Sequence, residues 1–181
     1  MSEFYIPTAS EQLSLPRSGL IKVTHSFARR VRSLVQRKGI EFSDSKSRTK
    51  SEKRMVAKIN ARGGRPLADI HGILFVMDED SFDPAFDLLR QEYPTPDLFP
   101  SGMATKRDRR DPEIRRSINS ASDDRFRPVI FNLLIPNGAR IAEVQLMTPE
   151  TYQIGRETRS QYVWTQQFLN RNFQYPTNNL R

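Results

Sequence analysis

Two stretches of the chain combine residue types that could handle a nucleotide. The first, residues 47–77, gathers basic side chains and then runs into an apolar segment that carries one acid, Asp69. The second, residues 126–148, ends in EVQLMT, where Glu143 stands among apolar neighbours. The first part of this stretch, residues 48–58, contains the basic residues Arg48, Lys50, Lys53, Arg54 and Lys58. Cations neutralise phosphates, carboxylates bind metal ions or accept protons, and nothing beside them resembles a nucleophile. The combination therefore indicates a nucleotide-handling site.

Length and composition limit the alternatives. The 181 residues suffice for one domain with a real core, and the formal net charge of +8 favours a polyanionic partner. The chain has no cysteine, which excludes disulfides, thiolate catalysis and Cys-based zinc sites, and two histidines are too few for a typical zinc centre. The sequence has no signal-peptide pattern and no apolar run long enough to span a bilayer. We therefore expect a soluble protein of the cytoplasm with no membrane partner.

Two predicted helices contribute basic residues. From residue 19 to residue 37, apolar residues recur at helical spacing, which predicts a helix packed on the core. We interpret its arginines as a solvated face rather than a nucleic-acid contact, because the apolar stripe already explains the sequence. Residues 49–62 are rich in good helix formers and predict a second helix. On it, Lys50, Arg54 and Lys58 would share one face, and a bound anion would relieve their mutual repulsion.

Two predicted strands carry the acids. Residues 67–77 are apolar on both faces, which predicts a central strand in which Asp69 must be paired or bound to a metal. Residues 127–147 predict a β-hairpin, whose second strand places Glu143 and Gln145 on one face. From spacing alone, a functional site and a pair of structural salt bridges explain the two acids equally well. The mixture of helices and strands indicates an α+β fold.

The same patterns predict a single domain with loosely ordered edges. Residues 1–18 are expected to form an N-terminal arm, residues 19–170 one domain and residues 171–181 a tail. Within the domain, residues 94–125 lack periodicity and are rich in proline and charge, so we expect a mobile basic loop. Loops of this kind often close over a ligand. A Thr-Pro pair directly after the hairpin predicts one more helix.

In order and spacing, three segments resemble the synthetase domain of RelA/SpoT-type alarmone synthetases, which includes small alarmone synthetases and toxin-like relatives. RTKS at 48–51 with Lys58 matches the family's Arg-x-Lys-Ser and helical lysine. DIHG at 69–72 fits its Asp-x-x-Gly, and EVQLMT at 143–148 reproduces its Glu-x-Gln-x-x-Thr. Each piece alone is weak, but three in order over residues 20–168 are more specific. The resemblance implies a nucleotidyltransferase-like fold, with a central mixed sheet of about five strands flanked by helices.

Four positions bear on the acceptor. Leu74 stands where the family has an arginine, and Ile130 stands where it has a histidine. Phe126 falls on the family's tyrosine, with Arg127 beside it, and a phenyl ring can still stack on a purine base. The pattern leaves guanine nucleotides, adenine nucleotides and the 3′ end of tRNA open as acceptors, all of which occur in the wider family.

The resemblance implies a reaction and a role for each matching residue. The reaction is transfer of the β,γ-pyrophosphate of ATP to the ribose 3′-hydroxyl of a purine nucleotide, with release of AMP. The implied cofactor is Mg²⁺, and Asp69 and Glu143 are the implied catalytic and metal-binding residues, with Glu143 as base or metal ligand. The implied ATP-binding residues are Arg48, Lys50, Arg54 and Lys58. The implied acceptor-binding residues are Phe126, Arg127, Gln145, Arg115 and Arg116.

Other functions remain open at the level of sequence. A non-catalytic RNA- or nucleotide-binding module would keep the same fold and basic surface, and a toxin-like pyrophosphokinase would act on tRNA. An oligomer or a complex with an inhibitory partner protein is compatible with the sequence. Delivery into another cell as a toxin is an alternative to a role in the cytoplasm of the producing cell.

Overall fold

A mixed β-sheet with helices on both sides forms the frame of the molecule. The computed structural model describes residues 8–61, 63–64, 67, 69–93, 106–111, 125, 127–136 and 140–157. The helices of this part are α1 (Ala9–Ser14), α2 (Arg17–Arg37), α3 (Glu52–Ala61), the short η1 (Glu79–Ser81), α4 (Phe82–Glu92) and a helical segment at 149–157. The strands are β1 (Asp44–Thr49), β2 (His71–Val76), β3 (Lys106–Asp108), β4 (Val129–Ile135) and β5 (Arg140–Met147).

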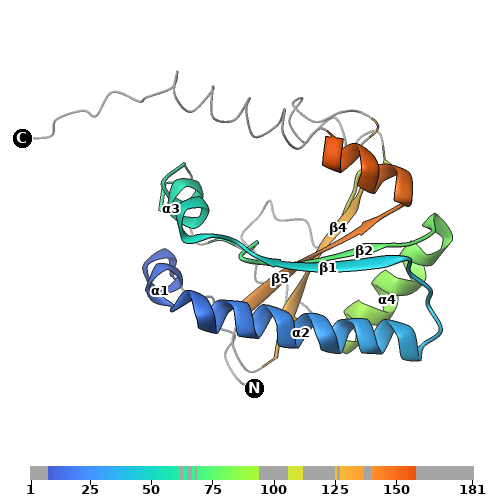
Figure 1. Cartoon of the computed structure of the whole chain (residues 1–181), viewed down its shortest axis with the longest axis horizontal. Coiled ribbons are helices and arrows are strands. Elements are labelled where there is room, and N and C mark those ends of the chain that lie inside the picture. The colour runs from blue at the N-terminus through green and yellow to red at the C-terminus, as the bar shows by residue number, and fades with distance from the viewer. Residues whose placement is uncertain are drawn as a thin grey trace, which may run out of the picture.

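The described strands form one five-stranded sheet in the order β1-β2-β5-β4-β3 (Figure 1). The central pair β2–β5 is parallel, and the other three neighbouring pairs are antiparallel. β4 and β5 are the two strands of the predicted hairpin. The structure therefore confirms an α+β fold with a mixed sheet of about five strands flanked by helices.

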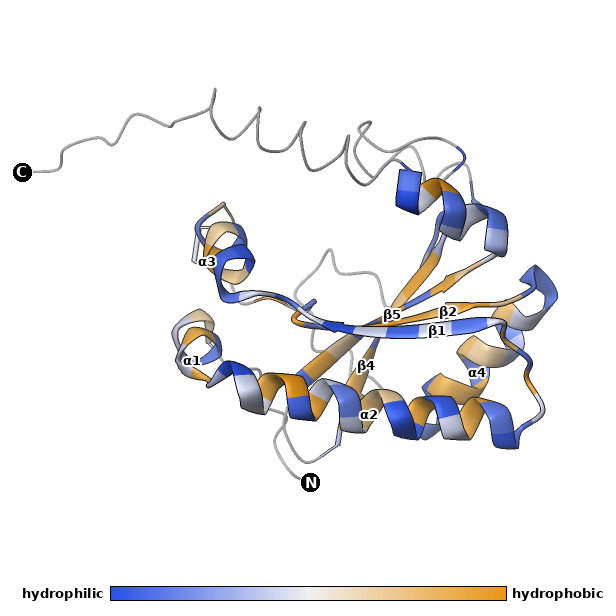
Figure 2. Ribbon diagram, viewed as in Figure 1, coloured by the Kyte–Doolittle hydropathy of each residue, from blue (hydrophilic) through white to orange (hydrophobic). Residues whose placement is uncertain are grey.

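Helices α2 and α4 cover one face of the sheet, and the main hydrophobic core lies between them and the strands (Figure 1). α2 follows the predicted helical spacing, and its apolar stripe is buried. Gly39, with φ of 73°, follows its end. Figure 2 shows that β4 and β5 are largely hydrophobic whereas β1 is mostly hydrophilic. The buried apolar residues of α2 are Leu20, Phe27, Ala28, Val31, Leu34 and Val35.

A second, smaller core joins α1 to α3 at one end of the sheet. Its buried residues are Leu20, Met55, Ile59, Leu67 and Ile70. Thr8 begins α1 with a capping box, since its side chain accepts from the backbone of Glu11 and the Glu11 carboxylate accepts from the backbone of Thr8. The sequence patterns do not predict this helix, which lies inside the segment expected to be an arm.

The structure corrects the predicted elements around the basic segment. The sequence predicts a short edge strand at residues 40–42 and a polar loop at 43–47, whereas the edge strand of the structure is β1, Asp44–Thr49. α3 begins only at Glu52, and the backbone N–H of Lys50 donates to the carbonyl of Ile70, so Lys50 continues the strand pairing. The prediction that Lys50, Arg54 and Lys58 share one helix face is therefore wrong, because Lys50 is not helical.

One predicted loop contains a short strand. β3 lies within residues 94–125, where the sequence predicts a loop throughout. The other residues of that loop, apart from 109–111 and 125, lie outside the described part. Among the helices of the described residues, none has the length and apolar character needed to cross a membrane.

Candidate active site

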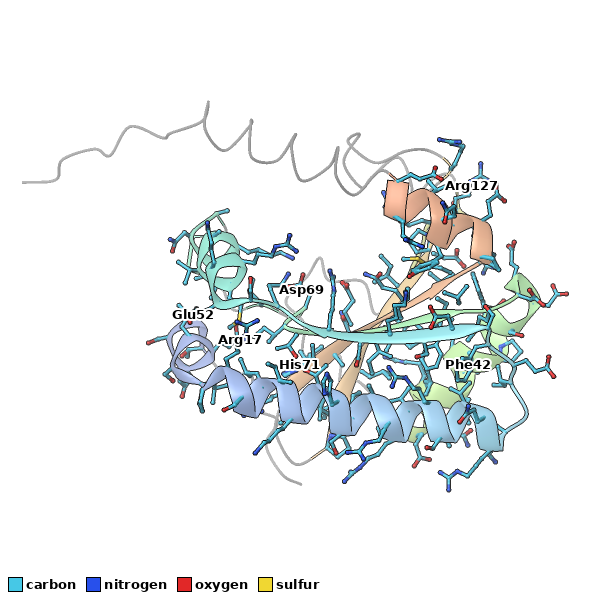
Figure 3. The ribbon with its side chains drawn as sticks, viewed as in Figure 1. Arg17, Phe42, Glu52, Asp69, His71 and Arg127 are labelled. Atoms are coloured by element: carbon cyan, nitrogen blue, oxygen red, sulfur yellow. The ribbon has the colours of Figure 1, made fainter. Side chains whose placement is uncertain are left out.

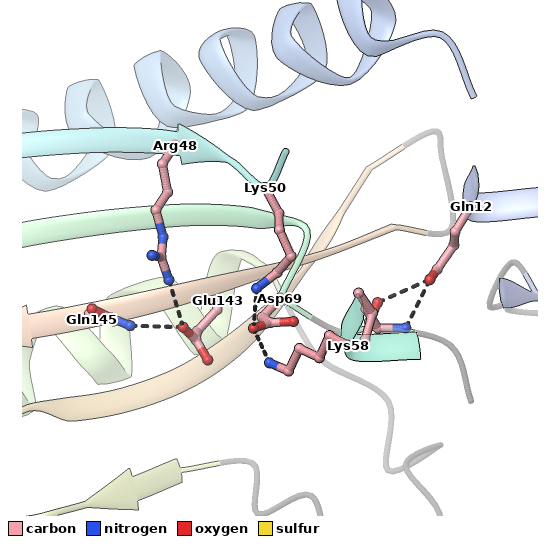
Figure 4. A network of polar contacts seen from close by, with 8 residues as sticks. Gln12, Arg48, Lys50, Lys58, Asp69, Glu143 and Gln145 are labelled. Atoms are coloured by element: carbon pink, nitrogen blue, oxygen red, sulfur yellow. Dashed lines mark hydrogen bonds and ion pairs between the residues drawn. The ribbon is translucent and has the colours of Figure 1, made fainter. Parts of the chain in front are cut away.

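The sheet face that points away from α2, here called the open face, carries the predicted acids. In the register, Gly72 of β2 lies opposite Arg48 of β1 and opposite Glu143 of β5, and Glu143 lies opposite Asn132 of β4. Residues that lie opposite each other in neighbouring strands project from the same face. Figure 4 shows Arg48, Glu143 and Asp69 extending to the same side. The two acids therefore share one face of the sheet.

Asp69 is held by two lysines from different elements. Its Oδ2 accepts a hydrogen bond from Lys50 Nζ at 2.9 Å and another from Lys58 Nζ. Lys50 follows the end of β1, and Lys58 lies in the last turn of α3. Burial alone would raise the pKa of the Asp69 carboxyl, but the charges and hydrogen bonds of Lys58 and Lys50 outweigh burial and lower the pKa to about 2. The carboxylate is therefore ionised at neutral pH.

The other oxygen of Asp69, Oδ1, is buried and has no hydrogen-bond partner among the described residues. A buried carboxylate oxygen without a donor is costly, and a divalent cation is one group that satisfies it. Within the described part of the chain, no cluster of three or more His, Cys, Asp or Glu is gathered to hold a metal. A metal at this position would draw its protein ligands from Asp69 and Glu143 and its other ligands from phosphates and water, as Mg²⁺ usually does.

Glu143 is largely enclosed, with 12% of its side chain exposed. Its Oε1 accepts a hydrogen bond from Gln145 Nε2 at 2.8 Å, and Arg48 Nη2 lies 3.9 Å from the same oxygen. The Arg48 side chain reaches Glu143 across Gly72, where an added Cβ would lie 3.0 Å from Arg48 Cγ and 3.1 Å from Arg48 Nε. Gly72 therefore permits a close approach, and the group that approaches is the Arg48 side chain.

The three central positions of the row next to Glu143 are uncharged, and Lys46 of β1 and Arg107 of β3 lie at its two ends in the register. Gln145 lies between Leu74 of β2 and Ile130 of β4 in the sheet register, and all three residues are half-buried. Leu74 and Ile130 are departures from the RelA/SpoT-type pattern, and the structure brings them to either side of one amide. We call these three positions the apolar strip. The open face thus has a charged end at Asp69 and the apolar strip farther along the strands.

Other predicted site residues are not brought to the acids. Arg54 is exposed on α3 and makes no ion pair with a described residue. Arg127 is exposed just before β4, and Figure 3 shows it well away from Asp69. Three predicted acceptor-binding residues lie outside the described part of the chain: Phe126, Arg115 and Arg116.

Gln12, which the sequence analysis missed, fixes the segment that leads to Asp69. It is 4% exposed, and its Nε2 donates to the carbonyl of Leu67 at 3.0 Å while its Oε1 accepts from the N–H of Leu67 at 2.8 Å (Figure 4). These two bonds imitate the pairing of a β-strand two residues before Asp69. No local pattern marks Gln12, because its burial depends on α1 packing beside α3.

Asn132 and Tyr152 are two further residues that the sequence analysis missed. Asn132 is 5% exposed, opposite Glu143. A polar residue in the otherwise apolar strand VIFNLLI is a signal that could have found it. Tyr152 belongs to the helical segment at 149–157; its hydroxyl accepts a hydrogen bond from Lys46 Nζ, which also lies 4.9 Å from the centre of the ring. This contact fastens the helical segment to β1.

His71 lies on the opposite face of β2, where it packs beneath α2. It is 2% exposed, and its Nδ1 lies 2.7 Å from the hydroxyl of Thr24 on α2. Burial and, to a smaller extent, the charge of Arg140 lower the pKa of His71 to about 4, so the imidazole is neutral at pH 7. Figure 3 shows Asp69 and His71 on opposite sides of the sheet.

Comparison with known proteins gives a likeness in structure alone. No protein-family model and no curated protein sequence matches the chain. Small alarmone synthetase 2 from Bacillus subtilis is 15% identical with a TM-score of 0.54, over 83% of this chain and 82% of that one. Small alarmone synthetase 1 from Bacillus subtilis, bound to its product pppGpp, is 13% identical with a TM-score of 0.53, over 81% and 77%.

A third solved structure, of a protein from Streptococcus mutans UA159, is 18% identical with a TM-score of 0.52, over 79% of this chain and 75% of that one. At these identities the likeness concerns the fold, and it covers most of each chain. It agrees with the resemblance that the three sequence segments carry and with the five-stranded mixed sheet. The chain therefore has the fold of the small alarmone synthetases.

Proposed function

We propose that the chain is an ATP-dependent pyrophosphokinase that transfers the β,γ-pyrophosphate of ATP to the ribose 3′-hydroxyl of a purine nucleotide and releases AMP. The observation that carries the proposal is the pair of acids on the open face, each in contact with cations, on the fold of the small alarmone synthetases. One protein of this fold is bound to its product pppGpp, which supports a nucleotide product here.

The triphosphate of ATP binds at the charged end of the open face. Lys50 and Lys58 supply two cations within hydrogen-bond reach of Asp69, and the half-exposed Arg48 extends over Gly72 toward Glu143. Positive groups fixed in this way neutralise the charge that a transferring phosphoryl group develops. Arg54, one turn before Lys58 on α3, offers a further cation at the rim.

Asp69 and Glu143 fit a bound Mg²⁺. Asp69 is ionised at neutral pH and keeps Oδ1 without a hydrogen-bond donor among the described residues, which suits a ligand to a hard cation. When bound, the metal supplies neutralisation of the phosphates and polarisation of the attacked phosphorus. Lys50 and Lys58 hold Asp69 in place through Oδ2, which leaves Oδ1 available for the metal.

Glu143 is the proposed base. The 3′-oxygen of the acceptor bonds to the β-phosphorus of ATP, and the bond from that phosphorus to the oxygen bridging to the α-phosphate breaks. AMP leaves with the bridging oxygen, and the proton of the 3′-hydroxyl passes to Glu143. Gln145 orients the carboxylate by donating to Oε1. No covalent intermediate with the protein is needed.

The acceptor lies along the apolar strip. Leu74 and Ile130 provide two apolar surfaces beside the Gln145 amide, which suits the flat face and polar edge of a purine base. Phe126, Arg127, Arg115 and Arg116 complete the acceptor side in this proposal. Guanine nucleotides, adenine nucleotides and the 3′ end of tRNA are the acceptors to be distinguished.

An incubation with γ-labelled ATP, Mg²⁺ and each acceptor in turn tests the proposal. The acceptors are GDP and GTP, then AMP, ADP and ATP, then deacylated tRNA, with products resolved by anion exchange. We expect one acceptor class to become labelled and the Glu143→Gln variant, folded by circular dichroism, to give no product. Absence of product with every acceptor from folded protein that binds ATP would overturn the proposal in favour of a non-catalytic nucleotide-binding module.

A further inference from the structure

Most of the excess positive charge of the chain belongs to one helix. Helix α2 contains six Lys and Arg residues and no Asp or Glu, a formal charge of +6, whereas the whole chain carries +8. The six residues are Arg17, Lys22, Arg29, Arg30, Arg32 and Arg37. The charge that suggests a polyanionic partner is therefore concentrated on α2 rather than in the candidate active site, where acids offset the basic residues.

The charges of α2 beyond its first turn lie away from the nucleotide site. α2 packs against the sheet face that carries His71, while Asp69 lies on the other side (Figure 3). Lys22, Arg29 and Arg30 are exposed and form no ion pair with a described residue. Within the described part of the chain these cations therefore have no acidic partner, and they lie on the side of the sheet opposite Asp69.

The spacing of the cations matches an extended partner. Lys22, Arg29 and Arg37 follow one another at intervals of two helical turns, which is roughly 10–12 Å along the axis. Between them the outer surface of α2 carries exposed polar residues that can donate hydrogen bonds, such as Ser33 and Gln36. Arg and Lys side chains with polar neighbours of this kind are the usual contacts to nucleic-acid phosphates.

Other partners fit this surface less well. An amphipathic helix at a membrane needs apolar residues to insert beside its cations, but the apolar stripe of α2 is buried in the core. The centre of a protein–protein interface is rich in aromatic and apolar residues, and the described residues expose one large hydrophobic side chain, Val56 of α3. A second copy of α2 would place like charges against each other.

We propose that the outer face of α2 binds the phosphodiester backbone of a nucleic acid through Lys22, Arg29, Arg30 and Arg37. The binding is independent of base sequence, because the contacts are made to phosphates. It is also independent of the proposed transferase activity, because the two surfaces lie on opposite faces of the sheet. The proposal goes beyond a solvated helix face, whose cations would attract a polyanion no more strongly than exposed cations elsewhere on the molecule.

Fluorescence anisotropy with a labelled 20-nucleotide RNA and a DNA of the same sequence tests this proposal across a series of salt concentrations. The double variant Lys22→Gln/Arg29→Gln removes two charges from α2. The matched variant Lys53→Gln/Arg156→Gln removes the same two residue types from exposed positions on α3 and on the helical segment at 149–157. Both variants have the same net charge, so only the location of the charge differs.

We expect the α2 variant to bind roughly tenfold or more weakly, with the slope of log K against log salt reduced by about 1.4, and the matched variant to bind like the wild type. Because the contacts are made to the phosphodiester backbone, we expect the RNA and the DNA to bind with similar affinity. Equal weakening in both variants, or no binding at physiological salt by the wild type, would overturn the proposal. Binding to vesicles containing phosphatidylserine without binding to either nucleic acid would assign the surface to membranes instead. Pyrophosphokinase activity, measured separately, should be unchanged in the α2 variant.

Discussion

Asp69 and His71 stand two residues apart, on opposite faces of the sheet. The pKa of each side chain is lowered, but the two causes are opposite: the surroundings favour the charged form of Asp69 and disfavour the charged form of His71. The pKa of Asp69 falls to about 2 because Lys58 and Lys50 stabilise its charged form in spite of burial. The pKa of His71 falls to about 4 because burial disfavours its charged form. The open face therefore keeps charge and can exchange its ion pairs for a ligand, whereas the face beneath α2 excludes charge and serves the fold.

The largest effect is expected when the charge on the open face is removed, and this effect is loss of catalysis. Asp69→Asn keeps the shape of the side chain but removes the charge that the two lysines and the proposed metal contact. We expect turnover to fall about a thousandfold or more, measured with labelled ATP and the best acceptor. Asp87→Asn, at an exposed position of α4, should stay within twofold of the wild type. If Asp69→Asn lowered turnover only twofold, Asp69 would not be a catalytic residue.

On the sheet face beneath α2, the expected effect is on stability in mild acid. The folded state holds His71 neutral down to about pH 4, whereas the unfolded chain protonates it near pH 6.5. The free energy of unfolding should therefore decrease as the pH falls from 6.5 to 4, by up to about 3 kcal/mol. Urea titrations at each pH measure this decrease. It should be absent in the His71→Asn variant and present in the His25→Asn variant, because His25 is exposed. Parallel curves for wild type and His71→Asn would contradict the assignment.

On the open face, the corresponding decrease should appear only at lower pH. The folded pKa of Asp69 lies below its ordinary value of 3.8, so its ion pairs contribute stability above that pH and lose it as the pH falls from about 4 to 2. The loss should amount to about 2 kcal/mol. The difference in unfolding free energy between wild type and Asp69→Asn should shrink across this window. A difference that stays constant would show that the lysines do not stabilise the carboxylate.

Gln12→Ala tests whether the position of Asp69 depends on α1. The variant leaves the buried N–H and C=O of Leu67 without partners, so we expect a loss of about 1–2 kcal/mol in unfolding free energy. The KM for ATP should rise more than the KM for the acceptor. The exposed Gln91→Ala on α4 should change stability by less than about 0.5 kcal/mol. Equal changes in the two KM values would make Gln12 a purely structural residue.

The smallest expected effect concerns Gly72. An alanine Cβ would press against the Arg48 side chain and move it from Glu143. Because Arg48 is half exposed and 3.9 Å from the carboxylate, the contact contributes under about 1 kcal/mol, and the KM for ATP should rise by about fivefold at most. Steady-state kinetics at saturating acceptor measure this change. Adding Gly72→Ala to an Arg48→Gln variant should have no further effect on this KM.

Local patterns were sufficient for much of the fold. The hairpin of β4 and β5 follows from alternation and a turn, and α2 follows from apolar spacing. β1 could not be predicted in the same way, because DSKSRT has no apolar alternation. As an edge strand, it turns Arg48 to the open face and small polar residues such as Thr49 toward α2, so hydrophobic patterning carries no information about it.

Site residues could be predicted where the signal lies within one segment of sequence. They could not be predicted where their role depends on contacts between segments that are distant in sequence. Asp69 and Glu143 stand out because each interrupts an apolar run. The pairing of Lys50 with Lys58 on one carboxylate depends on where β1 ends and α3 begins, which propensity does not fix within a few residues. Gln12 was not predictable, because its role exists only after α1 packs on the small core.

During synthesis, β2 leaves the ribosome long before β5. The two strands pair in parallel at the centre of the sheet, so the position beside β2 stays empty until the hairpin of β4 and β5 has been made. Such pairing between distant segments closes a long loop and is slow compared with local contacts. A nascent chain that ends before β5 contains Lys50, Lys58 and Asp69, but it lacks the strand that places Glu143 beside them.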